Sequence, residues 1–249
     1  MTSAQIESFP NLGASAPIVE ATIAIGSLAK VTWDEASLTK ALVEKLPDYP
    51  KLQALKSLQH EIKIEENRPA EQKLLDMGWQ GIRFESDDNH RVVQCLRDNF
   101  VFSQLHPYQN WDVFLEEALR LWEIHKEVYR SEDVQRLGLR FINRITPSQM
   151  QFELDDYYKD APKAPSGLGF TFTGFLHHDA FKVPMSDYNV NTVKTVQTEG
   201  TFGLIYDIDV FTTNVPDESV IEKKLVEMRH IKNKVFFGGI TEKAIKELS

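Results

Sequence analysis

The chain has 249 residues, of which 42% are hydrophobic and 26% are charged, and its formal net charge is −9. Proteins that coat nucleic acids carry an excess of lysine and arginine, so the acidic balance argues against that class. It leaves a nucleic-acid or nucleotide partner open but does not favour one. The hydrophobic fraction is ordinary for a globular protein and is sufficient for a sizeable core.

The cysteine content and the apolar segments indicate a compartment. Cys95 is the only cysteine, which excludes an intrachain disulfide and a cysteine-rich zinc site and favours reducing conditions. Residues 1–10 lack the basic segment and the continuous apolar run of a secretory signal. No apolar run approaches the roughly 18–20 residues that a transmembrane helix needs. We therefore expect a cytoplasmic protein without a membrane partner.

The first elements follow a polar leader at residues 1–15. Ile18 to Gly26 alternate between apolar and polar side chains, which predicts a half-buried strand. Asp34 can cap a helix that we expect from Glu35 toward Leu58. The prolines of residues 47–50 should interrupt this helix and divide it into a pair.

Short segments occupy the chain up to residue 105. His60 to Glu66 alternate and predict a strand, whereas Glu71 to Met77 are read as a short helix. Turns rich in Ser, Asp and Asn then separate three further expected strands, at residues 79–85, 91–96 and 100–105.

The strongest helical pattern follows Asn110, which can serve as its N-cap. Large side chains recur at spacings of three and four: Trp111, Phe114, Leu115, Ala118, Leu121, Trp122, His125 and Tyr129. A stripe of this kind must pack on a sheet, so both tryptophans are read as core residues.

The second half opens with a clear strand at Val134 to Ile145. An exposed loop at residues 155–167 follows, since this stretch is rich in proline, glycine and charge. Further strands are expected at residues 149–154, 168–178, 190–199 and 201–211. A long helix should begin near Pro216 and Asp217, and a short one should cover residues 242–248.

The order of elements in residues 16–131 is similar to the order in residues 132–249. We therefore predict an α+β fold of one compact domain, made of pseudo-duplicated antiparallel β-sheet layers, with a long helix packed on one face of each half. The sheet can be open or barrel-like, and the pattern does not decide between these forms.

One face of the predicted strands is unusually charged. In the strand at 134–145, Leu137 and Leu139 share one face, while Arg136, Arg140 and Arg144, here called the arginine row, share the other. The same division of the other strands gives further charged residues opposite the apolar face: Glu61, Lys63, Glu65, Arg83, Asp207 and Asp209.

Three interpretations of this face stay open. It can be a plain solvated face with cross-strand ion pairs. It can bind a protein partner, with the arginine row, Arg83 and Lys63 as the contact residues. In a closed barrel it would form a tunnel, where the arginine row would bind phosphate and Glu61, Glu65, Asp207 and Asp209 would hold a divalent cation.

Common enzyme motifs are absent from the sequence, including G-x-G-x-x-G, the P-loop, H-E-x-x-H and G-x-S-x-G. His177 and His178 are adjacent in an expected strand and would point to opposite faces, so they do not indicate a metal site. We predict no catalytic residue and no cofactor. The question of enzyme activity stays open, with the balance toward a non-enzyme.

Four stretches carry a resemblance: residues 16–21, residues 100–111, residues 134–145 and residues 236–243. They contain FVFSQLHPYQNW and VQRLGLRFINRI, and in order and spacing they resemble a sporadically distributed prokaryotic protein family of unknown function. The resemblance implies a bacterial cytosolic protein and a component of a mobile or defence-related gene cassette. It supplies no catalytic residue.

The sequence thus predicts a non-enzymatic binding or adaptor component with a protein partner. The alternative is a metal-dependent phosphohydrolase or nucleotide-binding tunnel protein. Triphosphate tunnel enzymes carry Glu-x-Glu-x-Lys on their first strand, whereas the segment from Glu61 to Glu65 is late and reordered. Self-association is also expected, because an apolar C-terminal helix follows Gly238-Gly239 and can pack on its own body or on a second copy.

Overall fold

The structure is a computed structural model. It describes residues 8–63, 71–149, 151–163, 165, 167, 169–170, 173–215 and 217–249, without the side chains of 14, 60–63 and 71. The prediction for Glu65 lies outside the described residues. For Glu61 and Lys63 the structure gives the backbone position only.

The elements of the first half are η1 (Gly13–Ser15), β1 (Ile18–Ser27), α1 (Glu35–Lys45), β2 (Lys51–Lys63), β3 (Glu71–Glu85), β4 (Arg91–Leu96), β5 (Asn99–Leu105) and α2 (Trp111–Tyr129). Those of the second half are β6 (Val134–Ile145), η2 (Leu154–Asp156), β7 (Leu176–Lys182), β8 (Asn189–Gln197), β9 (Gly203–Thr212), η3 (Glu218–Val220), α3 (Ile221–Gly239) and α4 (Glu242–Glu247). The predicted α+β class is confirmed.

The nine strands of the described residues form one antiparallel sheet in the order β2-β3-β4-β5-β1-β6-β9-β8-β7. The centre is the β1–β6 pair, where Ala24 lies opposite Gly138. On one side β1 pairs with the last strand of its own half, β5, and on the other side β6 pairs with β9. Each half then continues into a long helix. The predicted pseudo-duplication therefore takes the form of two related halves that meet at β1 and β6.

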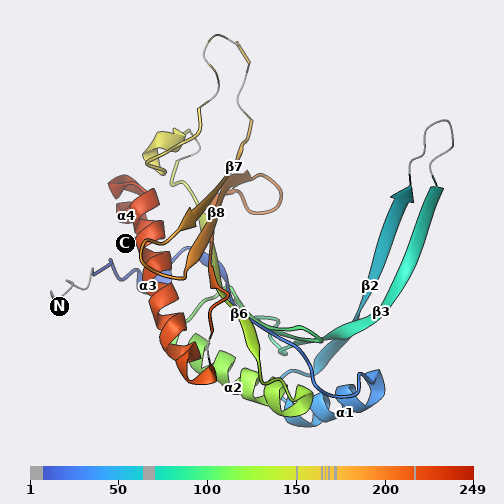
Figure 1. Cartoon of the computed structure of the whole chain (residues 1–249). Coiled ribbons are helices and arrows are strands. Elements are labelled where there is room, and N and C mark those ends of the chain that lie inside the picture. Colours follow the sequence, from blue (N-terminus) through green and yellow to red (C-terminus); the bar gives the residue numbers. More distant parts are fainter. Residues whose placement is uncertain are drawn as a thin grey trace.

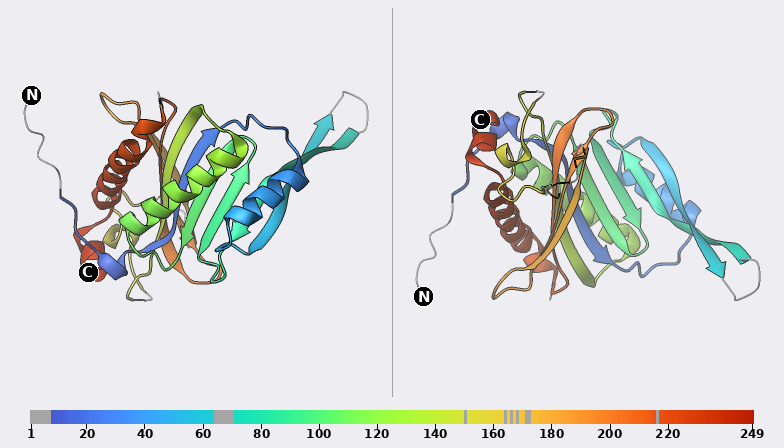
Figure 2. Two further views of the ribbon diagram at one scale, coloured as in Figure 1. Left: turned by 90° about the horizontal axis from the view of Figure 1, so that it is seen from below. Right: turned by 90° about the horizontal axis from the view of Figure 1, so that it is seen from above.

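The sheet is open, so the barrel-like alternative is wrong. Figure 1 shows the sheet as an arch, with α1 and α2 beneath it, α3 and α4 along one side, and β2 and β3 rising on the other. In Figure 2 the helices lie in front of the strands when seen from below, whereas from above the strands are uncovered. The helices therefore cover only the convex face.

The core lies between the convex face and the helices. It contains alternate side chains of the central strands, such as Ile23, Phe102 and Leu139, each fully buried. The predicted helix from Asn110 is confirmed, because the Asn110 side chain accepts a hydrogen bond from the Val113 amide at 3.0 Å. Trp111 and Trp122 are both buried, as expected for core residues.

Two predicted helices are wrong. The second member of the predicted pair, beyond Pro50, is the start of β2, and residues 71–77 belong to β3. These two strands pair with each other from Lys51–Glu85 to Lys63–Glu71. Ordinary residues differ by only about 0.7 kcal/mol in helix propensity, so a long antiparallel ladder outweighs a helical spacing of apolar residues.

The loop region of the second half also differs from the prediction. Over the described part of residues 149–154 there is no strand, and the η2 turn begins at Leu154. The strand expected at 168–178 begins only at Leu176, where β7 gains β8 as a neighbour. The strands expected at 190–199 and 201–211 are confirmed as β8 and β9.

The C-terminal helix packs on its own chain. The expected glycine break lies within the last turn of α3, which ends at Gly239. Beyond it, Ile240 forms a bridge with Tyr158, and both Ile240 and Ala244 are fully buried. The Lys243 ammonium lies 2.7 Å from the Asp156 carboxylate. These contacts occupy the apolar side of α4 within one molecule.

The ends of β2 and β3 leave the body of the sheet. Since β4 pairs with β3 only from Gly81 to Glu85, residues 56–63 and 71–79, here called the arm, pair only with each other (Figure 1). Leu58, Leu74 and Met77 of the arm are more than half exposed.

Among the described residues, no helix is both long enough and apolar enough to cross a membrane.

Candidate functional site on the concave face

The face without helices is here called the concave face. Alternation along β6 buries Leu137 and Leu139 against the helices and turns the arginine row the other way. Register then places other polar side chains on the same face: Glu20, Thr22, Arg83, Glu85, Ser103, Asp207 and Asp209. The predicted division of the strands into an apolar and a charged face is therefore present in the fold.

Arg140 and Asp207 form the shortest ion pair among the described residues of this face. Nε and Nη2 of Arg140 donate to the two carboxylate oxygens of Asp207 at 2.8 and 2.5 Å. This hydrogen bonding raises the pKa of Arg140. The Arg140 side chain is 50% exposed and that of Asp207 is 14% exposed, so the arginine is the more accessible member of the pair.

Arg136 lies beside the second carboxylate. Its Nη2 is 3.3 Å from Asp209 Oδ2, and its guanidinium lies 4.9 Å from the ring centre of Phe211. Burial raises the pKa of Asp209, while the positive charges of Arg136 and Arg140 act to lower it. Asp209 thus lies between the two arginines, with its side chain 25% exposed.

Gly138 makes room for Arg136 and not for a ligand. A Cβ at Gly138 would lie 2.7 Å from Arg136 Nη1. The missing side chain therefore allows the Arg136 guanidinium to fold along its own strand.

Arg144 occupies the end of the row near Gly203. A Cβ at Gly203 would lie 2.3 Å from Arg144 Cγ, so the arginine side chain runs across this glycine. The Arg144 guanidinium makes no ion pair or hydrogen bond with the described residues. Within the row, Arg144 is thus the arginine that can accept an external carboxylate without losing an internal one.

A hydroxyl cluster lies next to the row on β1 and β5. Glu20 Oε1 accepts hydrogen bonds from the hydroxyls of Thr22 and Ser103, both at 3.0 Å. Thr22 lies directly opposite Arg140 in the ladder. The alternation of side chains along residues 18–26 predicts that Glu20 and Thr22 share this face. Their contacts with Ser103 cannot be predicted in this way, because they depend on the register between β1 and β5.

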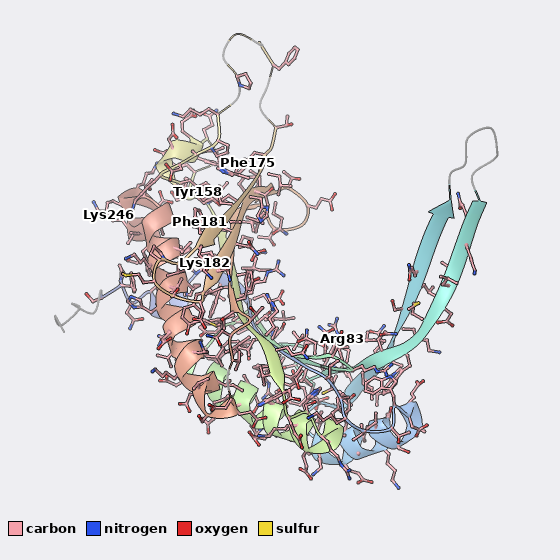
Figure 3. The ribbon with its side chains drawn as sticks, in the orientation of Figure 1. Arg83, Tyr158, Phe175, Phe181, Lys182 and Lys246 are labelled. Atoms are coloured by element: carbon pink, nitrogen blue, oxygen red, sulfur yellow. The ribbon has the colours of Figure 1, made fainter. Side chains whose placement is uncertain are left out.

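The remaining predicted binding residues lie far from the row. Arg83 pairs with Glu85 at 2.7 Å on β3, and Figure 3 shows Arg83 on the side of the arch near the arm. The backbone of Lys63 pairs with Glu71 at the far end of the arm. The arginine row, Arg83 and Lys63 therefore do not form one compact site.

The predicted metal residues are not brought together. Five strands separate Glu61 on β2 from Asp207 and Asp209 on β9, and both aspartates are engaged by arginines. Within the described ranges, no group of three His, Cys, Asp or Glu residues is arranged to hold a metal ion. Burial raises the pKa of Cys95 to about 12, which opposes formation of a thiolate nucleophile.

Comparison with known proteins adds no relative: no protein-family model matches the chain, and no curated protein matches it either. The resemblance in the four sequence stretches therefore stays a prediction.

Proposed function

We propose that this protein is a binding component without a catalytic centre, and that it holds a protein partner on the concave face of its sheet. The observation that carries the proposal is a curved sheet whose charged face is left uncovered by every helix of the described chain. Helices bury the other face, so the fold gives the concave face no structural cover of its own.

The chemistry of the face favours a protein over a polyanion. Arg140 is already satisfied by Asp207, so a phosphate group would have to displace a bidentate carboxylate. Positive and negative side chains alternate across β6 and β9, and the apolar side chains of Ile142 and Ile205 lie between them. Mixed charge with arginine and apolar contacts is typical of protein interfaces.

The cellular setting that we propose comes from the sequence. The single cysteine is reduced and buried, in keeping with the cytoplasm, and the resemblance in the four stretches implies a bacterial protein of a mobile or defence-related gene cassette. Self-association is a second form of partner binding, which the experiment below separates from binding of a different protein.

The alternative of a metal-dependent phosphohydrolase or nucleotide-binding tunnel has less support. Its tunnel needs a closed sheet, and its cation site needs Glu61 close to Asp207. A thermal-shift experiment with triphosphate or a nucleoside triphosphate and Mg²⁺ addresses it, because a ligand at about 100 times its Kd stabilises a protein by about 2.7 kcal/mol. A saturable shift would favour this alternative over a binding component.

The partner can be trapped from the concave face. We would replace Phe211 with the photo-crosslinking residue p-benzoylphenylalanine, and place the same residue at Val113 on α2 as a control, because Val113 is 46% exposed on the convex side. Crosslinking in the producing bacterium should attach one protein to the variant with the residue at position 211, and the same protein should not be attached to the variant with it at position 113. Mass spectrometry then identifies it, or identifies a second copy of this chain.

Binding must then be reproduced with purified proteins. The affinity of the identified partner is measured for the wild type, for Arg140→Ala with Arg144→Ala, and for Lys223→Ala, a control on α3 whose side chain is 78% exposed. The double substitution should weaken binding at least tenfold and the control should not. Equal affinity for all three would contradict the proposal.

A further inference from the structure

A cavity of about 870 Å³ lies on the helix side of the sheet, between β7, β8 and α3. Helix α3 packs on β6 and β9, and the cavity lies beside it, over the outer strands β7 and β8. Figure 3 shows Phe181 and Lys182 of β7 beside α3 in this region. The cavity is therefore separate from the concave face, which lies on the other side of the same strands.

The walls of the cavity are largely apolar. They come from β7, β8, the loop between them, and α3: Phe181, Val183, Pro184, Val190, Ile231 and Val235. Phe181 is 51% exposed and lies at the opening. Sites for small organic molecules typically have volumes of about 300–1,000 Å³ and are lined by apolar side chains with a few polar groups.

The polar groups form a row across three strands. Register places Lys194 of β8 between His177 of β7 and Tyr206 of β9. Lys194 is only 4% exposed. Its ammonium lies 5.1 Å from the ring centre of Tyr206 and 5.5 Å from that of Tyr158. Two aromatic faces thus hold the ammonium at the inner end of the cavity.

Lys194 has no carboxylate counter-ion among the described residues. No hydrogen bond or ion pair joins its ammonium to a described residue. Asp179, two residues beyond His177 on β7, is 3.0 Å from His177 Nε2. A buried ammonium without a carboxylate is costly in an apolar site, and an anion in the cavity would remove that cost.

The charge of the lining also favours an anion. Three lysines line the cavity, Lys182, Lys194 and Lys234, against two aspartates, Asp160 and Asp179. We propose that the cavity binds a small organic anion, with its carboxylate or phosphate group on Lys194 and its apolar body between β8 and α3. This site is additional to the proposed partner-binding face.

The end of α3 offers a way to block the cavity without damage to the fold. Gly238 and Gly239 both line it. A Cβ at Gly238 would meet no atom within 4 Å, whereas one at Gly239 would lie 2.5 Å from the Tyr206 hydroxyl. A large side chain at position 238 can therefore narrow the opening, and replacement of glycine within a helix favours the helix.

The experiment compares three ten-carbon probes by isothermal titration calorimetry on the full chain: decanoate, decyl phosphate and decanol. We expect one of the two anions to bind with a stoichiometry of one, at least tenfold more tightly than decanol. Preference for decanoate assigns a carboxylate ligand, and preference for decyl phosphate assigns a phosphate ligand. Absence of binding by both anions, or equal binding of decanol, would overturn the proposal.

Three variants test whether the probes bind in this cavity. Lys194→Met keeps the length of the stem and removes the charge, so it should weaken anion binding at least tenfold and leave decanol binding unchanged. Gly238→Phe should weaken binding of every probe. Lys223→Met, on the exposed side of α3, is the matched control and should bind as the wild type does. Circular dichroism establishes that each variant folds. Unchanged anion affinity in folded Lys194→Met and Gly238→Phe would place the probes elsewhere and contradict the site.

Discussion

Arg140 lies directly opposite Asp209 in the β6–β9 ladder, yet its two hydrogen bonds go to Asp207. Asp209 is left to Arg136, which approaches it at 3.3 Å. The charged face is therefore joined by diagonal pairs and not by direct cross-strand pairs, and each pair remains partly exposed.

The exposure of these pairs leads to the first prediction. Exposed ion pairs contribute about 0.2–1 kcal/mol, so Arg140→Ala with Arg144→Ala should lower the free energy of unfolding by no more than about 1 kcal/mol. Urea denaturation followed by circular dichroism measures the difference. A loss of several kcal/mol would mean that the face is part of the buried structure, and the proposed partner site would then fail.

The second prediction concerns Lys232 of α3. This residue is 7% exposed, and its ammonium lies 4.2 Å from the ring centre of Phe141. Burial, together with the nearby Arg229, lowers its pKa to about 7. An unfolded lysine has a pKa near 10.4, so between about pH 7 and pH 10 the unfolded chain binds more protons than the folded protein. Stability should therefore rise with pH in this window, by up to ~1.4 kcal/mol per pH unit from this group.

Lys232→Met isolates that contribution. The variant has no ammonium to deprotonate, so it should be more stable than the wild type at pH 7, and the difference should shrink toward pH 10. Denaturant unfolding of both proteins at four or five pH values gives the two curves. Parallel curves would show that Lys232 keeps an ordinary pKa in the folded protein.

The third prediction concerns His125 of α2, at the acidic end of the pH range. His125 is fully buried between aromatic rings, and burial lowers its pKa to about 3. Neither ring nitrogen has a hydrogen-bond partner among the described residues. The unfolded histidine takes up a proton near pH 6.5 and the folded one does not, so this group lowers stability as the pH falls from about 6.5 toward 3.

His125→Leu should remove this part of the acid sensitivity. Relative to the wild type, we expect the free energy of unfolding of the variant to decline less steeply below pH 6.5, by up to ~1.4 kcal/mol per pH unit. Thermal unfolding between pH 4.5 and pH 7.5 is a suitable measurement. The two proteins should keep a constant difference above pH 7, where the histidine is neutral in both states; a difference that grows there would point to another group.

The fourth prediction concerns the C-terminal segment. Deletion from Gly238 onward removes the buried side chains of Ile240 and Ala244 and the bridge between Ile240 and Tyr158. Loss of a fully buried isoleucine alone typically costs about 2–5 kcal/mol, so the truncated chain should unfold at a clearly lower denaturant concentration.

Light scattering on both proteins addresses assembly. A constant mass near 28.6 kDa at every concentration would exclude a dimer. A doubled mass that the truncation reduces to a single copy would place the contact at α4, and a doubled mass that survives truncation would place it elsewhere on the molecule.

Strong periodicity made part of this fold predictable. Residues 134–145 alternate so regularly that both the limits of β6 and the face of the arginine row follow from the sequence. The stripe from Trp111 to Tyr129 likewise defines α2. In both cases burial of one face against a neighbouring layer agrees with the local pattern, so local and tertiary preferences give the same answer.

Other features depend on contacts that are remote in the sequence. The local pattern of residues 51–58 does not predict a strand. They form one because they pair with β3, and the partner of Lys51, Glu85, lies 34 positions later in the sequence. Lys194 lies in a segment whose alternation predicts a strand. Its burial against Tyr206 depends on the register of β8 with β9, and its contact with Tyr158 depends on the position of a loop. The sequence pattern therefore does not predict the cavity on the helix side of the sheet.

The arm leaves the body of the sheet beside Gly81, which pairs with Leu55 on one side and Leu96 on the other. The Gly81 φ of 146° and the backbone of Cys95, 2.2 Å from where a Cβ would be, leave glycine as the residue that fits. The arm extends from this point to Glu71, a lever of roughly 33 Å at about 3.3 Å per residue. A difference of about 10° in the angle at which the arm leaves the sheet would displace its far end by roughly 6 Å, more than the ~4.8 Å spacing of two strands. The width between the arm and the β7–β8 hairpin therefore depends on the backbone of β3 at Gly81 and on the register shift of β2 between Leu55 and Leu58.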